Sequence, residues 1–321
     1  MSKMKLATII CWIVSLFVLV GLAVWFIFGA GIRGQNVGTF LNFNWNITDS
    51  ALDVEHTTTM PIEGVYSLDI DWTAGRLTIK PHDGDEIQIT EFSRRELRDE
   101  ERKSVSIENN TLNIDFRAGR VFGNVQQKNL ELLIPRELAA QFDAVSVNST
   151  SGRVNVNGIT ADTLEINSIS GRIELRNIET QTLRANATSG RIELVAVNAN
   201  AMNLRSISGR IELLSGQVQH LDTHTTSGRQ YLNGIFDNAT VRSISGRVEF
   251  RSEVVPDSLD VNATSGRIAV IVPSDEPISV QHSGTGRFES EIPIITGTAD
   301  AQFRLHSTSG RIVISEWVNT R

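Results

Sequence analysis

Nine arginines, each directly after a glycine, are the residues whose type and spacing most clearly suggest chemistry. A guanidinium group presents several N–H donors that match carboxylate and phosphate oxygens, so a row of these groups would attract an anionic ligand. The set consists of Arg153, Arg172, Arg191, Arg210, Arg229, Arg247, Arg267, Arg287 and Arg311.

Five of these arginines have a neutralising partner, because a glutamate follows two residues later on the same face of a predicted strand. The partners are Glu174, Glu193, Glu212, Glu249 and Glu289. Arginines stacked in register would lie about 4.8 Å apart, and unit charges at that distance repel by about 0.9 kcal/mol in water. One interpretation is therefore a self-neutralised ladder of exposed ion pairs.

Arg153, Arg229, Arg267 and Arg311 lack this partner. The residues in the glutamate position are Asn155, Tyr231, Ala269 and Val313. The alternative hypothesis is that Arg229, Arg267 and Arg311, in the C-terminal half, form a positively charged surface. These three are our candidate site residues for an anionic envelope polymer or a lipid headgroup.

The other potentially reactive residues favour no catalytic site. His220, Asp222 and His224 alternate on one predicted strand face, where successive side chains lie nearly 7 Å apart, so one metal ion would reach all three only with strain. The single cysteine, Cys11, excludes an intramolecular disulfide and a cysteine-cluster metal site. Because no nucleophile–base set converges in the sequence, we predict no enzyme activity, no metal and no cofactor.

The elements that position the arginines repeat with a period near 19 residues. The glycines before the arginines are spaced by 18 to 20 residues, with one final interval of 24. In each repeat, apolar residues alternate with polar ones, as in half-buried strands. The inward pairs after the glycine include Ile173/Leu175 and Ile211/Leu213, those before it include Leu164/Ile166 and Met202/Leu204, and a third row holds Ile159, Ile178, Val197 and Ile235.

Three inward rows per repeat predict an all-β fold, a single-chain β-solenoid of about nine coils with three short faces. Each glycine is expected to turn the chain at a corner with a positive φ. Ala74-Gly75-Arg76 repeats the motif within a less regular region. We therefore predict an irregular N-terminal β cap at residues 61–140 and a regular solenoid at 141–321.

The N-terminal region predicts one membrane anchor. The 27 residues from Leu6 to Ile32 contain no charge, which exceeds the roughly 20 needed to cross a bilayer. Lys3 and Lys5 precede this span, so residues 1–33 are predicted to be a cytoplasmic tip and transmembrane helix, followed by a linker at 34–60. A cleaved signal peptide is the alternative, although the apolar stretch is long for one.

The chain outside the membrane is predicted to be acidic. The whole sequence has a net charge of −7, and Lys3, Lys5 and Arg33 contribute +3, so the remainder carries −7 − 3 = −10. This balance argues against a nucleic-acid partner.

The repeated T/I-S-G-R-I-E-L strands behind a single N-terminal span resemble the bacterial "putative adhesin" family over residues 61–316. The family is a domain of unknown function with a β-solenoid fold, and it includes membrane-anchored accessory proteins of Gram-positive cell-envelope stress operons. The resemblance implies surface adhesion. Together with the predicted anchor, it leads us to expect a membrane-anchored, extracytoplasmic adhesion or ligand-binding module of the cell envelope. The expected partners are the membrane, from the N-terminal span, and an anionic envelope polymer, lipid or protein, from the arginine analysis. A passive scaffold or spacer is the alternative, and a polysaccharide-active enzyme is the third.

Overall fold

The computed structural model describes residues 52, 54–117, 127–274, 277–295 and 299–317. The predicted membrane span at Leu6–Ile32 and most of the predicted linker lie outside these residues. Within the described part of the chain, no helix has the length and apolar character needed to cross a bilayer.

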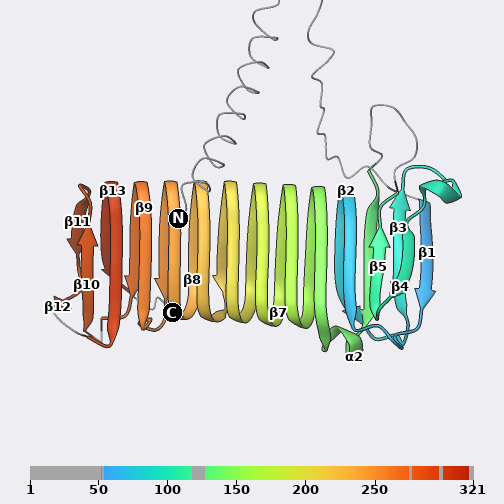
Figure 1. Ribbon diagram of the computed structural model, residues 1–321, viewed down its shortest axis with the longest axis horizontal. Helices are drawn as coiled ribbons and strands as arrows, with labels where there is room; N and C mark the ends of the chain where they lie inside the picture. Colours follow the sequence, from blue (N-terminus) through green and yellow to red (C-terminus); the bar gives the residue numbers. More distant parts are fainter. Residues whose placement is uncertain (1–51, 53, 118–126, 275–276, 296–298, 318–321) are drawn as a thin grey trace, which may run out of the picture. The chain divides into compact units, whose positions relative to one another are not determined.

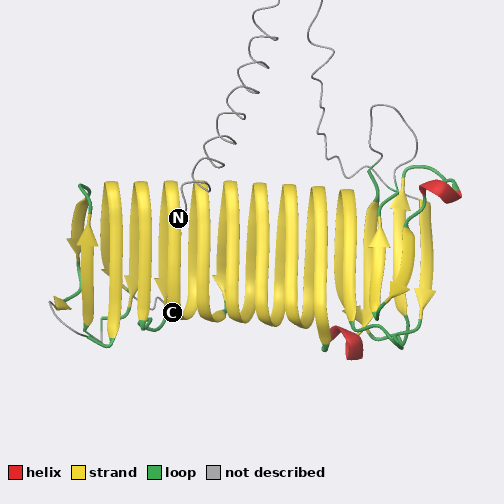
Figure 2. Cartoon of the chain, viewed as in Figure 1, coloured by secondary structure: helices red, strands yellow, loops and turns green. Residues whose placement is uncertain are grey.

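The described chain is almost entirely β-structure, and its strands form one thirteen-stranded sheet that is wound into coils (Figures 1 and 2). The only helices in this part are the short 3₁₀ helix η2 (Asp99–Glu101) and α2 (Arg136–Ala139). The strands are β1 (Val54–Met60), β2 (Ser67–His82), β3 (Ile87–Ser93), β4 (Ser104–Glu108), β5 (Thr111–Asp115), β6 (Asn129–Pro135), β7 (Phe142–Ser215), β8 (Gln217–Ser252), β9 (Ser258–Val272), β10 (Ile278–Ser283), β11 (Arg287–Ser290), β12 (Ile294–Ile295) and β13 (Ala301–Glu316).

The coils stack as parallel strands in register, which confirms the predicted β-solenoid. β7 continues through several coils and β8 through two, because the pairing between neighbouring coils is nearly continuous around the corners. Equivalent arginines face each other across the ladder: Arg210 pairs with Arg229, Arg247 with Arg267, and Arg267 with Arg311. Identical positions of successive repeats therefore form columns along the solenoid axis.

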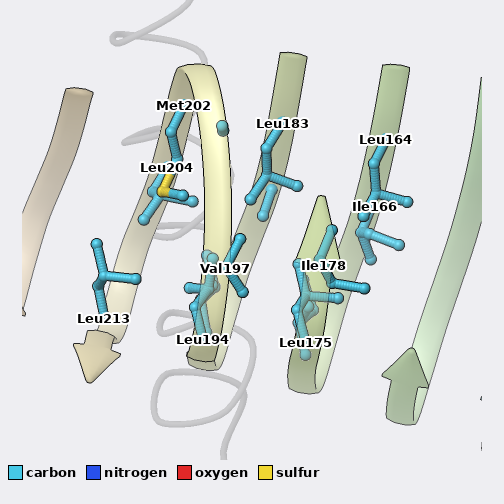
Figure 3. Packing of buried hydrophobic residues seen from close by; sticks show 14 of the residues in the cluster. Leu164, Ile166, Leu175, Ile178, Leu183, Leu194, Val197, Met202, Leu204 and Leu213 are labelled. Atoms are coloured by element: carbon cyan, nitrogen blue, oxygen red, sulfur yellow. The ribbon is translucent and has the colours of Figure 1, made fainter. Parts of the chain in front are cut away.

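The core consists of the predicted inward rows. Figure 3 shows leucine, isoleucine, valine and methionine side chains of successive coils packed against one another, among them Leu164, Leu183 and Leu204. One prediction is wrong: Ile235 is half-buried, and Phe236 is the inward residue at 1% exposure. The repeat from Gly228 to Gly246 is one residue shorter than 19, which changes the side-chain alternation there.

The glycine column turns the corner, as expected, but not every glycine does so for the same reason. Gly171 has a φ of +153°, and a Cβ added to it would lie 1.9 Å from the carbonyl oxygen of Gly152. The φ of Gly209 lies outside the left-handed region, which corrects our prediction for this position. A Cβ on Gly209 would still lie 2.0 Å from the Gly190 oxygen, so close approach of the backbones is the constraint there.

The order of the coils at both ends differs from the order of the chain. β2 pairs directly with β7, while β5 and β6, which lie between them in sequence, pair with the other side of β2. The regular stack thus includes β2, whereas we predicted that it begins at residue 141. At the other end, β13 lies between β9 and the pair β10–β11 (Figure 1).

The amino-acid pattern explains the position of β13. Its four large inward residues, Phe303, Leu305, Ile312 and Ile314, are all buried and suit a coil that is covered on both sides. The coil formed by β10 and β11 has fewer buried apolar residues, and Phe288 in β11 is only half-buried. The coil with the incomplete apolar set therefore occupies the end of the stack.

Candidate functional site

The arginine column follows the glycine corner on the outward face of the strands. Each arginine is the first residue of the strand that leaves the corner, and its side chain points away from the core because the next residue points inward. Neighbouring coils in a sheet are about 4.8 Å apart, so the guanidinium groups are close enough to interact with one another and with a shared partner.

In the N-terminal half of the column, the arginines are neutralised as the ladder interpretation predicts. Arg172 lies 3.0 Å from Glu174, and Arg210 lies 3.1 Å from Glu212. Arg153, which has no glutamate of its own, contacts Glu174 of the next coil at 3.8 Å. Ion pairs within and between coils thus offset the repulsion between stacked arginines.

The structure contradicts the premise that Arg311 lacks a partner. Because β11 stacks directly on β13, Glu289 of β11 contacts both Arg311 and its own neighbour Arg287. The hydrogen bond from Arg311 lowers the pKa of the Glu289 carboxyl. Arg311 is therefore not part of an unneutralised surface.

Of the predicted site residues, Arg229 and Arg267 remain candidates, and the structure adds Arg247 to them. All three side chains are exposed, and none forms an ion pair among the described residues. We call Arg229, Arg247 and Arg267 the open arginine row. They occupy three successive coils, since Gly246 lies against Gly228, and Arg247 pairs in register with Arg267.

Arg247 was missed because Glu249 follows it at the expected spacing. Glu249 instead contacts Arg251 at 3.9 Å. Arg251 also donates to the Tyr231 hydroxyl at 3.3 Å and lies 5.5 Å from the ring centre of Trp317. Arg251, two residues after Glu249, was the feature of the sequence that could have revealed this, because it competes with Arg247 for the same carboxylate.

The strand face of His220, Asp222 and His224 is the other position at which the sequence suggested metal ligands. Asp222 accepts a hydrogen bond from Arg242 at 3.1 Å, so it is an ion-pair partner of Arg242 rather than a metal ligand beside His220 and His224. In the described ranges, no three histidine, cysteine or carboxylate side chains gather as a metal site would require.

A second group of charges is buried in the N-terminal end of the solenoid. The Lys128 ammonium lies 2.6 Å from Glu91, and the two side chains are only 2% and 0% exposed. Lys128 also donates to the carbonyl oxygens of Glu101 and Arg117 at 2.8 and 2.9 Å, and it lies 4.2 Å from the Phe116 ring centre. Burial lowers the pKa of Lys128, and the Glu91 carboxylate opposes that effect.

Further contacts complete this buried cluster. Arg95 donates two hydrogen bonds to the Glu101 carboxylate, at 2.9 and 2.8 Å, and these contacts lower the pKa of Glu101 to about 2. Lys103 donates to the carbonyl oxygen of His56 at 2.8 Å, and burial lowers its pKa to about 8. The charges are bound by one another and by backbone oxygens, so we interpret this cluster as a structural element.

The fold and the site define the class of protein: an all-β solenoid with a glycine corner and an outward arginine in each regular coil. The chain belongs to the Toastrack DUF4097 family, which matches residues 65–315. This confirms the family resemblance seen in the sequence.

Three solved structures are similar to the chain. A "putative adhesin" from Bacteroides fragilis is 14% identical with a TM-score of 0.47, covering 83% of this chain and 98% of that one. A "putative adhesin" from Parabacteroides merdae is 11% identical with a TM-score of 0.48, covering 83% and 97%. A "putative lipid binding protein" from Parabacteroides distasonis is 12% identical with a TM-score of 0.35, covering 83% and 98%. Among curated proteins, the chain has no match.

Proposed function

We propose that this protein is a membrane-anchored, extracytoplasmic ligand-binding module of the bacterial cell envelope, and that the open arginine row binds an anionic envelope component. The observation that carries the proposal is the exposure of Arg229, Arg247 and Arg267 without ion pairs in the described chain, whereas the equivalent arginines of earlier coils contact glutamates. The predicted anchor at Leu6–Ile32 would keep the module at the membrane.

The spacing of the row suits a polymer with repeated negative charges. Three guanidinium groups on neighbouring coils would bind anionic oxygens through charge-assisted hydrogen bonds. An otherwise acidic ectodomain, with a net charge of −10, would repel such a polymer elsewhere and so favour binding at the row. The proposed role is therefore adhesion or ligand binding rather than catalysis.

The test compares two sets of substitutions in the full-length protein. The combined variant Arg229→Gln, Arg247→Gln and Arg267→Gln should lose binding to purified teichoic acid at low salt, and wild-type binding should weaken as salt is raised. The matched control, Arg172→Gln with Arg191→Gln and Arg210→Gln, removes three arginines that contact glutamates and should retain most of the binding.

Equal binding by both variants and the wild type would contradict the proposal. Absence of binding by the wild type to teichoic acid and to anionic vesicles would favour the scaffold alternative. Anchoring is tested separately: protease added to intact protoplasts should digest the solenoid and leave the N-terminal span in the membrane fraction.

A further inference from the structure

One corner of the solenoid presents a row of outward β-branched side chains, which we call the corner ridge. It consists of Thr150, Ile169, Thr188, Ile207, Thr226, Ile244 and Thr264. The inter-coil pairing is interrupted at this position: Ser206 pairs with Thr225 and Ser208 with Ser227, but Ile207 and Thr226 are not paired. These residues therefore lie at the bend itself.

The isoleucines of the ridge are unusually exposed. Ile169, Ile207 and Ile244 are 57%, 56% and 48% exposed, and they are among the most exposed large apolar residues of the described chain. An isolated exposed apolar residue is common on protein surfaces. Here the residues recur in every second coil along one edge, with threonine methyl groups between them, so the ridge could serve as an interaction surface.

Arginines flank the ridge on both sides in the C-terminal half. The sequence RSISGR occurs at 205–210 and again at 242–247, so Ile207 and Ile244 each lie between two arginines. Arg205 and Arg247 are exposed and form no ion pair among the described residues. Arg210 contacts Glu212 and Arg242 contacts Asp222, each at 3.1 Å. At Ile169 the residue two positions earlier is Asn167, so this end of the ridge is less basic.

We propose that the corner ridge and its flanking arginines dock on the surface of an anionic lipid bilayer. A bilayer complements this arrangement because the isoleucine tips would enter the boundary region while the guanidinium groups remain at the anionic headgroups. A dissolved anionic polymer would contact the arginines but would bury little of the isoleucines. The exposed isoleucines therefore favour a membrane surface over a free polymer as the partner of the ridge.

The N-terminal segment supports the choice of this partner. The docking inference rests on the proposed anchor, whose span ends at Ile32, 22 residues before β1 begins at Val54. A tether of that length keeps the start of β1 within about 80 Å of the membrane even when the tether is fully extended. Because docking is then intramolecular, a surface of modest affinity would be occupied for much of the time.

The experiment uses the full-length protein reconstituted in vesicles. In a Cys11→Ser background, Ser227→Cys next to the ridge carries a fluorescent label, and brominated lipids in the bilayer report its proximity by quenching. With the wild-type ridge, the fluorescence of this label should be strongly quenched in phosphatidylglycerol vesicles and much less quenched in phosphatidylcholine vesicles. A label at Asn200→Cys, on a different part of the coil, should be quenched weakly in both.

Matched variants exploit the natural alternation of the ridge. Ile207→Thr with Ile244→Thr places at these positions the residue that the neighbouring coils already carry, so the fold should persist. The loss of apolar burial should reduce the docked-to-undocked ratio by about tenfold. Thr226→Ile with Thr264→Ile extends the apolar row and should raise the ratio.

The outcomes separate the docking inference from the proposed function. Reduced quenching in the threonine variant, with unchanged teichoic acid binding, would support docking. Unchanged quenching in both ridge variants would overturn it, even if the open arginine row still binds the polymer. If the ridge variants leave quenching unchanged and removal of the open arginine row leaves polymer binding unchanged, both proposals fail.

Discussion

The two ends of the solenoid have a similar order of strands, but different side chains cover their outermost strands. At each end the chain leaves one coil, forms strands that lie outside it, and returns to pair with the coil that it left, although the outermost N-terminal strand, β1, comes before this path begins. At the N-terminal end, β1 and β3 form antiparallel strands over a buried cluster that contains Lys128 and Glu91. At the C-terminal end, the outermost strands are parallel and short, and Ile294 and Ile295 are 38% exposed.

This difference shows how an edge strand can be protected in two ways. An open sheet edge offers unpaired backbone groups to other chains, and short strands and charged side chains reduce that hazard. The C-terminal end uses short strands with the exposed ion pair between Arg311 and Glu289. The N-terminal end adds the buried ion pair between Lys128 and Glu91. Since a solenoid is stabilised coil by coil, the two ends should respond differently to mutation.

The largest effect is expected at the N-terminal cluster. Lys128→Met leaves the Glu91 carboxylate buried without its partner, and loss of one member of a buried pair costs about 3–5 kcal/mol. Denaturant unfolding should reveal this loss, and hydrogen exchange should locate it in β1, β3 and β6. At the other end, Arg311→Gln removes an exposed pair, for which about 0–1 kcal/mol is typical. Equal losses of unfolding free energy in the two variants would contradict the expectation that the N-terminal end depends more on its charged residues.

A substitution at a corner glycine in the middle of the stack should make the two ends of the solenoid unfold less cooperatively. Gly209→Ala would place a Cβ 2.0 Å from the Gly190 oxygen, and overpacking of this kind costs about 1–3 kcal/mol. Thermal melts should show a lower midpoint and a broader transition, because coils on the two sides would unfold less cooperatively. Glu212→Gln, in the same coil but on the outward face, is the control and should change the midpoint less. The reverse ranking would show that the corner assignment is incorrect.

Acid should open the N-terminal end through Glu101. Its folded-state pKa is about 2, below the ordinary value of 4.5, so the stabilisation is complete above about pH 4.5 and is lost as the pH falls towards 2. Hydrogen exchange of β3 and β4 should accelerate over that interval. Glu101→Gln should remove this pH dependence, and an unchanged acid response in that variant would assign it to other carboxylates.

The smallest effect on stability is expected for Glu289→Gln at the C-terminal end. The side chain is partly exposed, so its contacts with Arg287 and Arg311 contribute little to folding. The same change would leave Arg311 without its partner, directly beside Arg267. Teichoic acid binding should therefore increase while the melting temperature changes little, and unchanged binding would limit the site to the open arginine row.

The site residues were predicted in part from sequence. Arg229 and Arg267 were identified by the absence of glutamate two residues later, and the structure leaves both without ion pairs in the described chain. Arg311 was misassigned because its partner, Glu289, belongs to a coil that precedes it in the chain but lies outside it in space. Arg247 was missed because the side-chain preference of Glu249 for Arg251 depends on local geometry.

The sequence by itself determined the repeating unit: the period near 19 residues, the glycine corner, the inward apolar rows and the outward arginines all follow from local spacing and side-chain alternation. Only the tertiary structure decided which coil lies beside which at the ends. Successive repeats carry nearly the same pattern, so each could pair with any other, and the order of β9, β13 and β10 depends on how completely each coil fills the core between its neighbours. The ion pairs between coils, and hence the positions of the arginines without partners, follow from that order.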